Sequence, residues 1–230
     1  MKSKNVLKTT VIAAAVAGAS MTAPMVANAE VSASLGASSF YLWRGQDVSD
    51  GAGVIHGSVD YGHSSGFYAG VWGSSESALG GEYDAYAGFA GEIGSLSYDI
   101  SYIGYMYPAG DVGLGDMGDF VLGLGLADFS LTYYASYADG DDGDKAFGDN
   151  TYVTLGYAYD KFGFLVGQAI NDLDDTDYTH IDLSYSPIEN LTFTLSKVVS
   201  ADDGAVAVVD DTFLLDNQDP LFHVSYSFVF

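Results

Sequence analysis

Residues 82–106 contain two runs in which apolar and polar positions alternate, EYDAYAGFAGEIGSLSYDISYIGYM. The apolar positions are every second residue: Tyr83, Ala85, Ala87 and Phe89 in the first run, and Leu96, Tyr98, Ile100 and Tyr102 in the second. A period of two is the side-chain period of a β-strand with two unlike faces. Because a tight turn at 92–94 joins the runs, the sequence predicts an antiparallel hairpin here.

The same pattern recurs along the chain and predicts twelve strands, at 31–44, 54–62, 67–75, 82–91, 95–106, 118–126, 129–137, 151–159, 162–170, 178–186, 191–199 and 220–230. Their connections alternate strictly between tight turns and longer loops. The tight turns are 63–66, 92–94, 127–128, 160–161 and 187–190; the longer loops are 45–53, 76–81, 107–117, 138–150, 171–177 and 200–219.

This rhythm predicts an all-β fold, a transmembrane antiparallel up-and-down β-barrel of about 12 strands. The N- and C-termini and the tight turns are then periplasmic, and the longer loops lie outside the cell. A secreted β-sandwich also shows alternating strands, with its apolar face buried against a second sheet. The ordered loop lengths and the many tyrosines near strand ends favour the barrel.

Composition excludes several other classes of protein. The chain has 7 Lys and Arg against 31 Asp and Glu, and it has no cysteine. A nucleic-acid partner is therefore not expected, because phosphate contacts need clustered basic side chains. Disulfide and thiolate sites are impossible. Beyond the N-terminal segment, no apolar run approaches the 18 residues that a membrane-spanning helix needs.

The N-terminal segment is typical of a secretory signal peptide. Lys2, Lys4 and Lys8 precede an apolar run at 11–19, and the small-residue motif Ala27-Asn28-Ala29 follows. We expect residues 1–29 to be a cleaved Sec-type signal peptide and residues 30–230 to form one barrel domain of the bacterial outer membrane. That mature chain holds four bases and all 31 acids, a formal charge of −27.

Charged residues inside the predicted strands point to the barrel interior. Five carboxylates fall opposite the apolar stripe of their strand, as a charge must if the stripe faces hydrocarbon. The only arginine, Arg44, lies near the outer end of the first strand. It either pairs with a loop acid at the rim or reaches into the lumen and creates a transverse field. With two histidines, the predicted pore-lining residues are Arg44, His56, Asp60, Glu82, Asp84, Asp99, His180 and Asp182.

No enzyme activity is predicted, although two histidines stand beside acids or hydroxyls. His180 precedes Asp182 and Ser184, and His223 precedes Ser225. A nucleophilic triad needs its base within roughly 2.6–3.2 Å of the hydroxyl, whereas the strand rise alone separates same-face neighbours by about 6–7 Å. A triad would have to be assembled across strands. Polar lining of the lumen is the preferred interpretation, and no catalytic residue is assigned.

The acidic segment 139–144 contains four aspartates and two glycines, a composition that suits a hard cation. An EF-hand loop also needs a Glu at its twelfth position and flanking helices. Asn150 occupies that position, and the flanks are predicted strands. No metal or cofactor site is therefore predicted, beyond weak divalent cation binding by acidic extracellular loops.

Three segments carry a resemblance to a known family. Residues 40–45 (FYLWRG), 66–74 (GFYAGVWGS) and 82–88 (EYDAYAG) are similar to the opening hairpins of the TorF porin family. The resemblance implies an outer-membrane barrel of unassigned substrate. The final strand also resembles the signal that the barrel assembly machinery recognises, with Phe230 last and apolar residues at alternate positions before it.

The resulting functional hypothesis is an outer-membrane channel for passive diffusion of small polar or cationic solutes. The alternative is a non-transporting barrel whose acidic surface loops bind cations or partners. The expected partners are outer-membrane lipid and lipopolysaccharide, the barrel assembly machinery during insertion, and small solutes.

Overall fold

A computed structural model describes residues 30–75, 80–139, 145–172, 176–202 and 219–230. The predicted signal peptide at 1–29, the centre of the acidic loop at 140–144 and most of the loop at 200–219 lie outside these ranges. Within them, no helix is long and apolar enough to cross a membrane.

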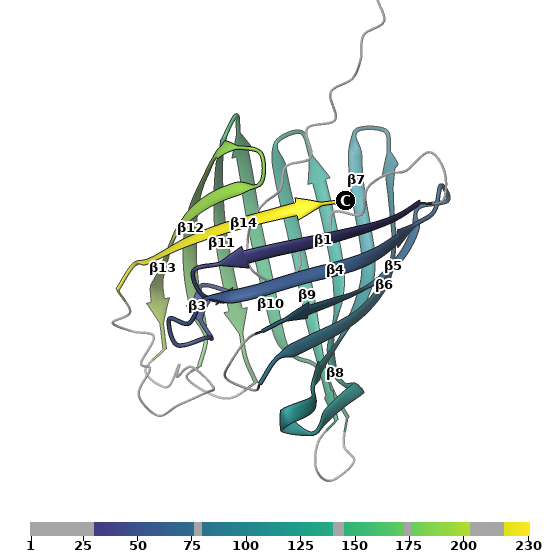
Figure 1. The fold of residues 1–230 in the computed structure, drawn as a ribbon, viewed down its shortest axis with the longest axis horizontal. Helices are drawn as coiled ribbons and strands as arrows, with labels where there is room; N and C mark the ends of the chain where they lie inside the picture. The colour runs from purple at the N-terminus through teal and green to yellow at the C-terminus, as the bar shows by residue number, and fades with distance from the viewer. Residues whose placement is uncertain (1–29, 76–79, 140–144, 173–175, 203–218) are drawn as a thin grey trace, which may run out of the picture.

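Twelve antiparallel strands close into a barrel, which confirms the predicted fold class (Figure 1). They are β1 (Glu30–Ser38), β4 (Val54–Gly62), β5 (Phe67–Ser74), β6 (Glu82–Ile93), β7 (Leu96–Tyr107), β8 (Val112–Leu126), β9 (Phe129–Asp139), β10 (Lys145–Tyr159), β11 (Phe162–Ile170), β12 (Tyr178–Ile188), β13 (Leu191–Ala201) and β14 (Leu221–Val229). Each pairs with its sequence neighbours, and β1 closes the ring against both β4 and β14.

Both ends of the barrel domain lie at the rim that carries the tight turns. Glu30 at the start of β1 pairs with Gly62 at the end of β4, beside the turn at 63–66. The Phe230 backbone exchanges two hydrogen bonds with Ala33, at N–O distances of 2.8 and 3.3 Å. The strand ends that the longer connections join lie at the opposite rim. Which rim faces the periplasm stays a prediction.

The barrel is apolar outside and polar inside. On β4, Ile55 and Val59 are 61% and 52% exposed, while the alternate residue Asp60 is half-buried. On β13, Leu195 is exposed, while Ser196 is completely buried. Soluble proteins show the opposite arrangement. The interior is therefore held by hydrogen bonds between side chains as well as by contacts between aromatic rings.

Three predicted strand boundaries were wrong by six residues each, and the others lie within two residues of the observed ones. The first predicted strand, 31–44, ends at Ser38, and the chain then forms a short hairpin of β2 (Leu42–Trp43) and β3 (Gln46–Asp47). The physical reason is visible in Phe40-Tyr41-Leu42-Trp43, four consecutive apolar residues that cannot alternate between lipid and lumen. The other two strands begin six residues earlier than predicted: β8 at Val112, after the short 3-10 helix η1 (Pro108–Gly110), and β10 at Lys145.

Candidate functional site

The connection between β1 and β4, residues 39–53, folds into the barrel, and we call it the inner loop. Its residues contact strands around the whole ring. The Phe40 ring packs edge-on against His223 of β14, Tyr41 bonds to β6, and Arg44 pairs with β8. A segment that reaches such distant strands must cross the lumen. Phe40, Tyr41 and Leu42 are accordingly buried.

A two-residue turn forms the tip of the inner loop. Leu42 pairs with Asp47 and Trp43 with Gln46, so Arg44 and Gly45 make the turn between them. Both have positive φ, 48° and 84°, as a type I′ turn requires. Gly45 is also needed for space, because a Cβ there would lie 2.5 Å from Cγ of His180.

The base of the inner loop is fixed by its own hydrogen bonds. The carboxylate of Asp47 accepts from the backbone N–H of Ser49 at 2.9 Å and from that of Gly51 at 2.8 Å. The Ser49 hydroxyl in turn accepts from the backbone N–H of Tyr41 at 2.7 Å. The loop therefore has a defined shape and carries its tip to a fixed place in the lumen.

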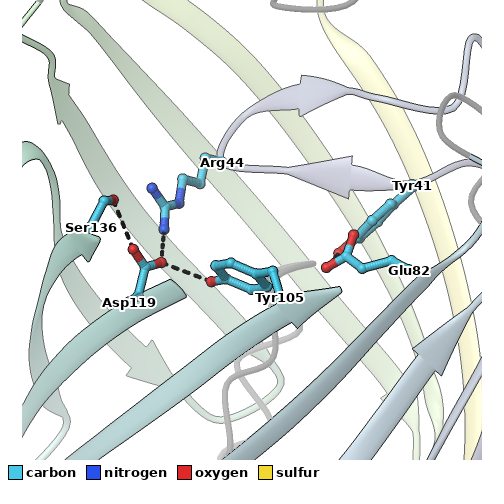
Figure 2. A network of polar contacts seen from close by, with 6 residues as sticks. All are labelled: Tyr41, Arg44, Glu82, Tyr105, Asp119 and Ser136. Atoms are coloured by element: carbon cyan, nitrogen blue, oxygen red, sulfur yellow. Dashed lines mark hydrogen bonds and ion pairs between the residues drawn. The ribbon is translucent and has the colours of Figure 1, made fainter. Parts of the chain in front are cut away.

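At the tip, Arg44 forms an ion pair with Asp119 on β8 (Figure 2). Asp119 also accepts from the Tyr105 hydroxyl at 2.8 Å and from the Ser136 hydroxyl at 2.7 Å. Burial by itself lowers the pKa of Arg44, but Asp119 and the surrounding tyrosines together outweigh this and raise it. The guanidinium therefore stays charged in its buried position.

Three aromatic rings surround the same guanidinium. Its central carbon lies 4.5 Å from the ring centre of Trp43, 4.7 Å from that of Tyr152 and 5.2 Å from that of Tyr134. These distances are within the range of cation–π attraction. Carboxylate and rings together form a complete cation-binding environment.

A second contact of the inner loop joins it to the acidic part of the wall. The Tyr41 hydroxyl donates to Glu82 Oε1 at 3.3 Å (Figure 2). Burial raises the pKa of Tyr41 well above its ordinary value, and Glu82 and Asp84 raise it further. Tyr41 thus remains a neutral donor. Glu82 and Asp84, two residues apart on β6, are only 3% and 2% exposed.

A buried chain of polar groups runs along the opposite wall. The Tyr152 hydroxyl lies 2.7 Å from Nε2 of His180, and Nδ1 of His180 lies 3.0 Å from Oδ1 of Asp182. The Ser196 hydroxyl donates to that same Asp182 oxygen at 2.6 Å. His180 and Asp182 share one strand, so their side chains lean together and close the gap that strand rise alone would leave. Because the serine bonds to the acid and not to the histidine, this is not the order of a nucleophilic triad.

The remaining predicted lumen residues contact partners on other strands. Asp99 on β7 accepts from the Tyr68 hydroxyl at 2.7 Å, and Asp60 on β4 accepts from the Tyr86 hydroxyl. His56 stacks on Trp72, with ring centres 6.1 Å apart. Among the described residues, no three His, Asp or Glu side chains are grouped so that they could hold a metal ion.

The structure divides the eight predicted residues between separate groups, and their role as pore lining stays a prediction. Arg44 stands with Asp119, Glu82 with Asp84, and His180 with Asp182. Asp119 was missed because, as the second residue of the predicted strand 118–126, it was counted with the acids of the preceding loop. Its alternation with exposed Phe120 was the signal that could have placed it inside.

The comparisons with known proteins identify a family. A family model described as "Bacterial protein of unknown function (Gcw_chp)" matches residues 22–217. This chain belongs to the Gcw_chp family. The narrower TorF resemblance is not confirmed by this match and stays a prediction. No curated protein matches the chain.

Among solved structures, members of several porin groups resemble this Gcw_chp protein. One described as KdgM porin has 8% identity and a TM-score of 0.45, covering 86% of this chain and 96% of its own. NanC porin has 11% identity and a TM-score of 0.41, covering 87% and 98%. The Pseudomonas aeruginosa outer membrane protein opdK has 13% identity and a TM-score of 0.41, covering 88% and 61%. With TM-scores below 0.5, these likenesses carry no argument about function.

Proposed function

We propose that this chain is a porin-like channel of the bacterial outer membrane, through which small polar or cationic solutes diffuse. The observation that carries the proposal is the closed barrel with an apolar exterior and an acidic, hydrogen-bonding interior. Both termini and the tight turns are assigned to the periplasm, as in bacterial barrels of this kind.

The exterior supports a membrane location. Large apolar side chains are exposed at alternate positions on strands around the ring, including Val71 at 54%, Ile100 at 59% and Phe222 at 60%. A soluble protein rarely exposes so large a continuous apolar surface. Lipid and lipopolysaccharide are the proposed surroundings, and the barrel assembly machinery is the proposed partner during insertion.

The interior supports a preference for cations. We assign Asp60, Glu82, Asp84, Asp99 and Asp182 to the lumen side of their strands, because they are buried or bond to tyrosines two strands away, and Arg44 is paired with Asp119. A lumen lined mainly by carboxylates concentrates cations and repels anions. Twelve strands leave a bore between that of side-chain-filled eight-stranded barrels and that of porins with 16–18 strands.

The burial of the inner loop also favours a second candidate, a barrel that does not transport. Leu42 is 0% exposed and Asp119 is 1% exposed, so the lumen is packed where the tip meets β8. In that case the acidic surface loops would bind cations or partners, and the inner loop would be a permanent plug.

Planar-bilayer recordings distinguish the two candidates. The refolded wild-type barrel is compared with a variant in which Gly-Gly replaces residues 42–47. A channel predicts discrete conductance in the wild type and a larger conductance in the variant. A plug predicts a silent wild type and a conducting variant. If both proteins fold, as judged by heat-modifiable gel mobility, and neither conducts, the channel proposal fails.

A further inference from the structure

We infer that the barrel wall contains a binding site for guanidinium-bearing solutes, and that Arg44 occupies it as a built-in ligand. The wall site consists of Asp119, Tyr105, Ser136, Tyr134 and Tyr152, from strands β7, β8, β9 and β10. The inference names the solute class of the proposed channel, and in that respect it rests on the proposed function.

The wall site is held in place without help from Arg44. Asp119 is oriented by Tyr105 and Ser136, which donate to its two different oxygens. Tyr152 is anchored at its hydroxyl by His180. A polar pocket whose groups are already oriented does not have to be ordered by its ligand, which favours binding.

Space for that anchoring comes from a glycine on the strand between. A Cβ on Gly167 would lie 2.5 Å from the Tyr152 hydroxyl and 2.2 Å from Nε2 of His180. The Tyr152 side chain can therefore cross β11 and hold its ring beside the guanidinium.

The chemistry of the wall site matches one kind of ligand. A carboxylate supplies the charge-assisted bond that a guanidinium makes best, and aromatic faces attract its delocalised cation. The Tyr105 and Ser136 hydroxyls already donate to Asp119, so those protons are not available to an anion. An anion or an uncharged solute would lose most of these interactions.

Arg44 reaches the wall site from a separate segment of chain. The turn at 44–45 belongs to the inner loop, whereas every group of the wall site belongs to the barrel. An arginine at positive φ is also unusual, since type I′ turns favour Asn, Asp or Gly there. The turn itself does not favour arginine at this position. The interactions of the Arg44 side chain with the wall site explain why arginine is there.

A free guanidinium solute must therefore compete with Arg44. Removing the tethered cation while keeping the turn should vacate the wall site, and Arg44→Asn does this because Asn-Gly is a favoured type I′ pair. Arg44→Lys is the matched control, since it keeps a tethered cation. Arg44→Asn with Asp119→Asn removes the carboxylate as well.

Binding is measured by calorimetry on refolded protein in detergent micelles, with methylguanidinium as probe and methylurea as its uncharged counterpart. Arg44→Asn should bind methylguanidinium about tenfold or more tightly than wild type and Arg44→Lys, because no tethered cation competes. Adding Asp119→Asn should abolish the gain, and methylurea should bind none of the four proteins measurably. Equal binding by Arg44→Asn and wild type, or by Arg44→Asn and the double variant, would overturn the inference. If Arg44→Asn does not refold, Arg44→Gln takes its place with the same expected outcomes.

A second measurement separates this inference from the proposed channel. Agmatine, a longer solute with the same head group, should block bilayer currents more strongly in Arg44→Asn than in wild type. Binding of methylguanidinium in micelles without any bilayer current would support the wall site and contradict the channel proposal. Bilayer current without methylguanidinium binding would support the channel proposal and contradict the wall site.

Discussion

Tyrosines inside the barrel reach acids or histidine two strands away by crossing a glycine. Tyr68 crosses at Gly88, Tyr86 crosses at Gly70, and Tyr152 crosses at Gly167. In each case a Cβ on the glycine would lie within 2.6 Å of the tyrosine hydroxyl. These glycines therefore make room for bonds that tie three strands together.

Gly167→Ala should destabilise the barrel, because its new methyl group clashes with both Tyr152 and His180. The expected cost is roughly 1–3 kcal/mol, the range for overpacking and for a buried polar group that loses its partner. Urea unfolding in micelles measures it. Gly123→Ala is the matched control, since the nearest heavy atom to its Cβ is Cβ of Asp99 at 3.4 Å. Equal stability of the two variants would contradict the inference that the Tyr152 side chain needs Gly167 in order to pass over β11.

At the residue level, alternation alone predicts which positions of a strand are exposed and which are covered. Parity places Asp60 and Asp182 opposite exposed apolar neighbours, and in the structure Asp60 is half-buried and Asp182 is buried. That they line a pore stays a prediction. Parity could not reveal that Tyr86 bonds to Asp60 or Tyr152 to His180. Those partners lie two strands apart, and their meeting depends on register and on the glycine between them.

The pairing of the terminal strand β14 with β1 is extended by the residue that follows the strand, Phe230. β14 and β1 form five register pairs, compared with nine between β1 and β4. The two backbone bonds between Phe230 and Ala33 extend this short seam. Closure of the barrel at β1 and β14 is therefore more vulnerable than closure at β1 and β4.

Deleting Phe230 should lower the yield of folded, heat-modifiable barrel, because it removes both seam bonds and the terminal aromatic side chain. Phe230→Ala keeps the backbone bonds and removes only the side chain. A defect in the deletion alone assigns the effect to seam closure, and an equal defect in both variants assigns it to the aromatic signal. Normal yield of the deletion variant would contradict both roles.

The assignment of long loops and tight turns to opposite rims of the barrel predicts which positions can be labelled on intact cells. The natural chain has no cysteine, so each introduced cysteine is a single reporter. Asp50→Cys and Asp202→Cys on the long-loop rim should react with an impermeant maleimide. Ser64→Cys and Glu189→Cys on the tight turns should react only after lysis. The reverse pattern would invert the proposed orientation.

At the level of elements, strand number and loop order were predictable, but the inner loop was not. Period two and the alternation of short and long connections depend only on local sequence. The path of residues 39–53 depends on contacts with β6, β8, β12 and β14, all distant in sequence. The run of four apolar residues at 40–43 indicated an interruption without indicating its direction.

The whole molecule combines a strong negative charge with one inward-facing arginine. Arg44 is paired with Asp119, and the sequence holds no second arginine to balance the other lumen carboxylates. The potential along the lumen should therefore be negative apart from the tip of the inner loop.

This potential predicts that the pore prefers cations, and that salt weakens the preference. The Debye length falls from about 10 Å at 0.1 M to about 3 Å at 1 M, so charges on the wall are screened from the centre of the lumen. Reversal potentials across a salt gradient should show cation preference that decreases as the mean salt concentration rises.

The combined change of Asp60, Asp84 and Asp182 to Asn tests whether these side chains produce the preference. Asn keeps the size of each side chain and can still accept the bonds from Tyr86 to position 60 and from Ser196 to position 182. The triple variant should therefore refold with normal heat-modifiable mobility while its reversal potential moves toward zero. Anion preference in the wild type, or an unchanged reversal potential in a folded triple variant, would mean that these carboxylates do not line the path of the ions.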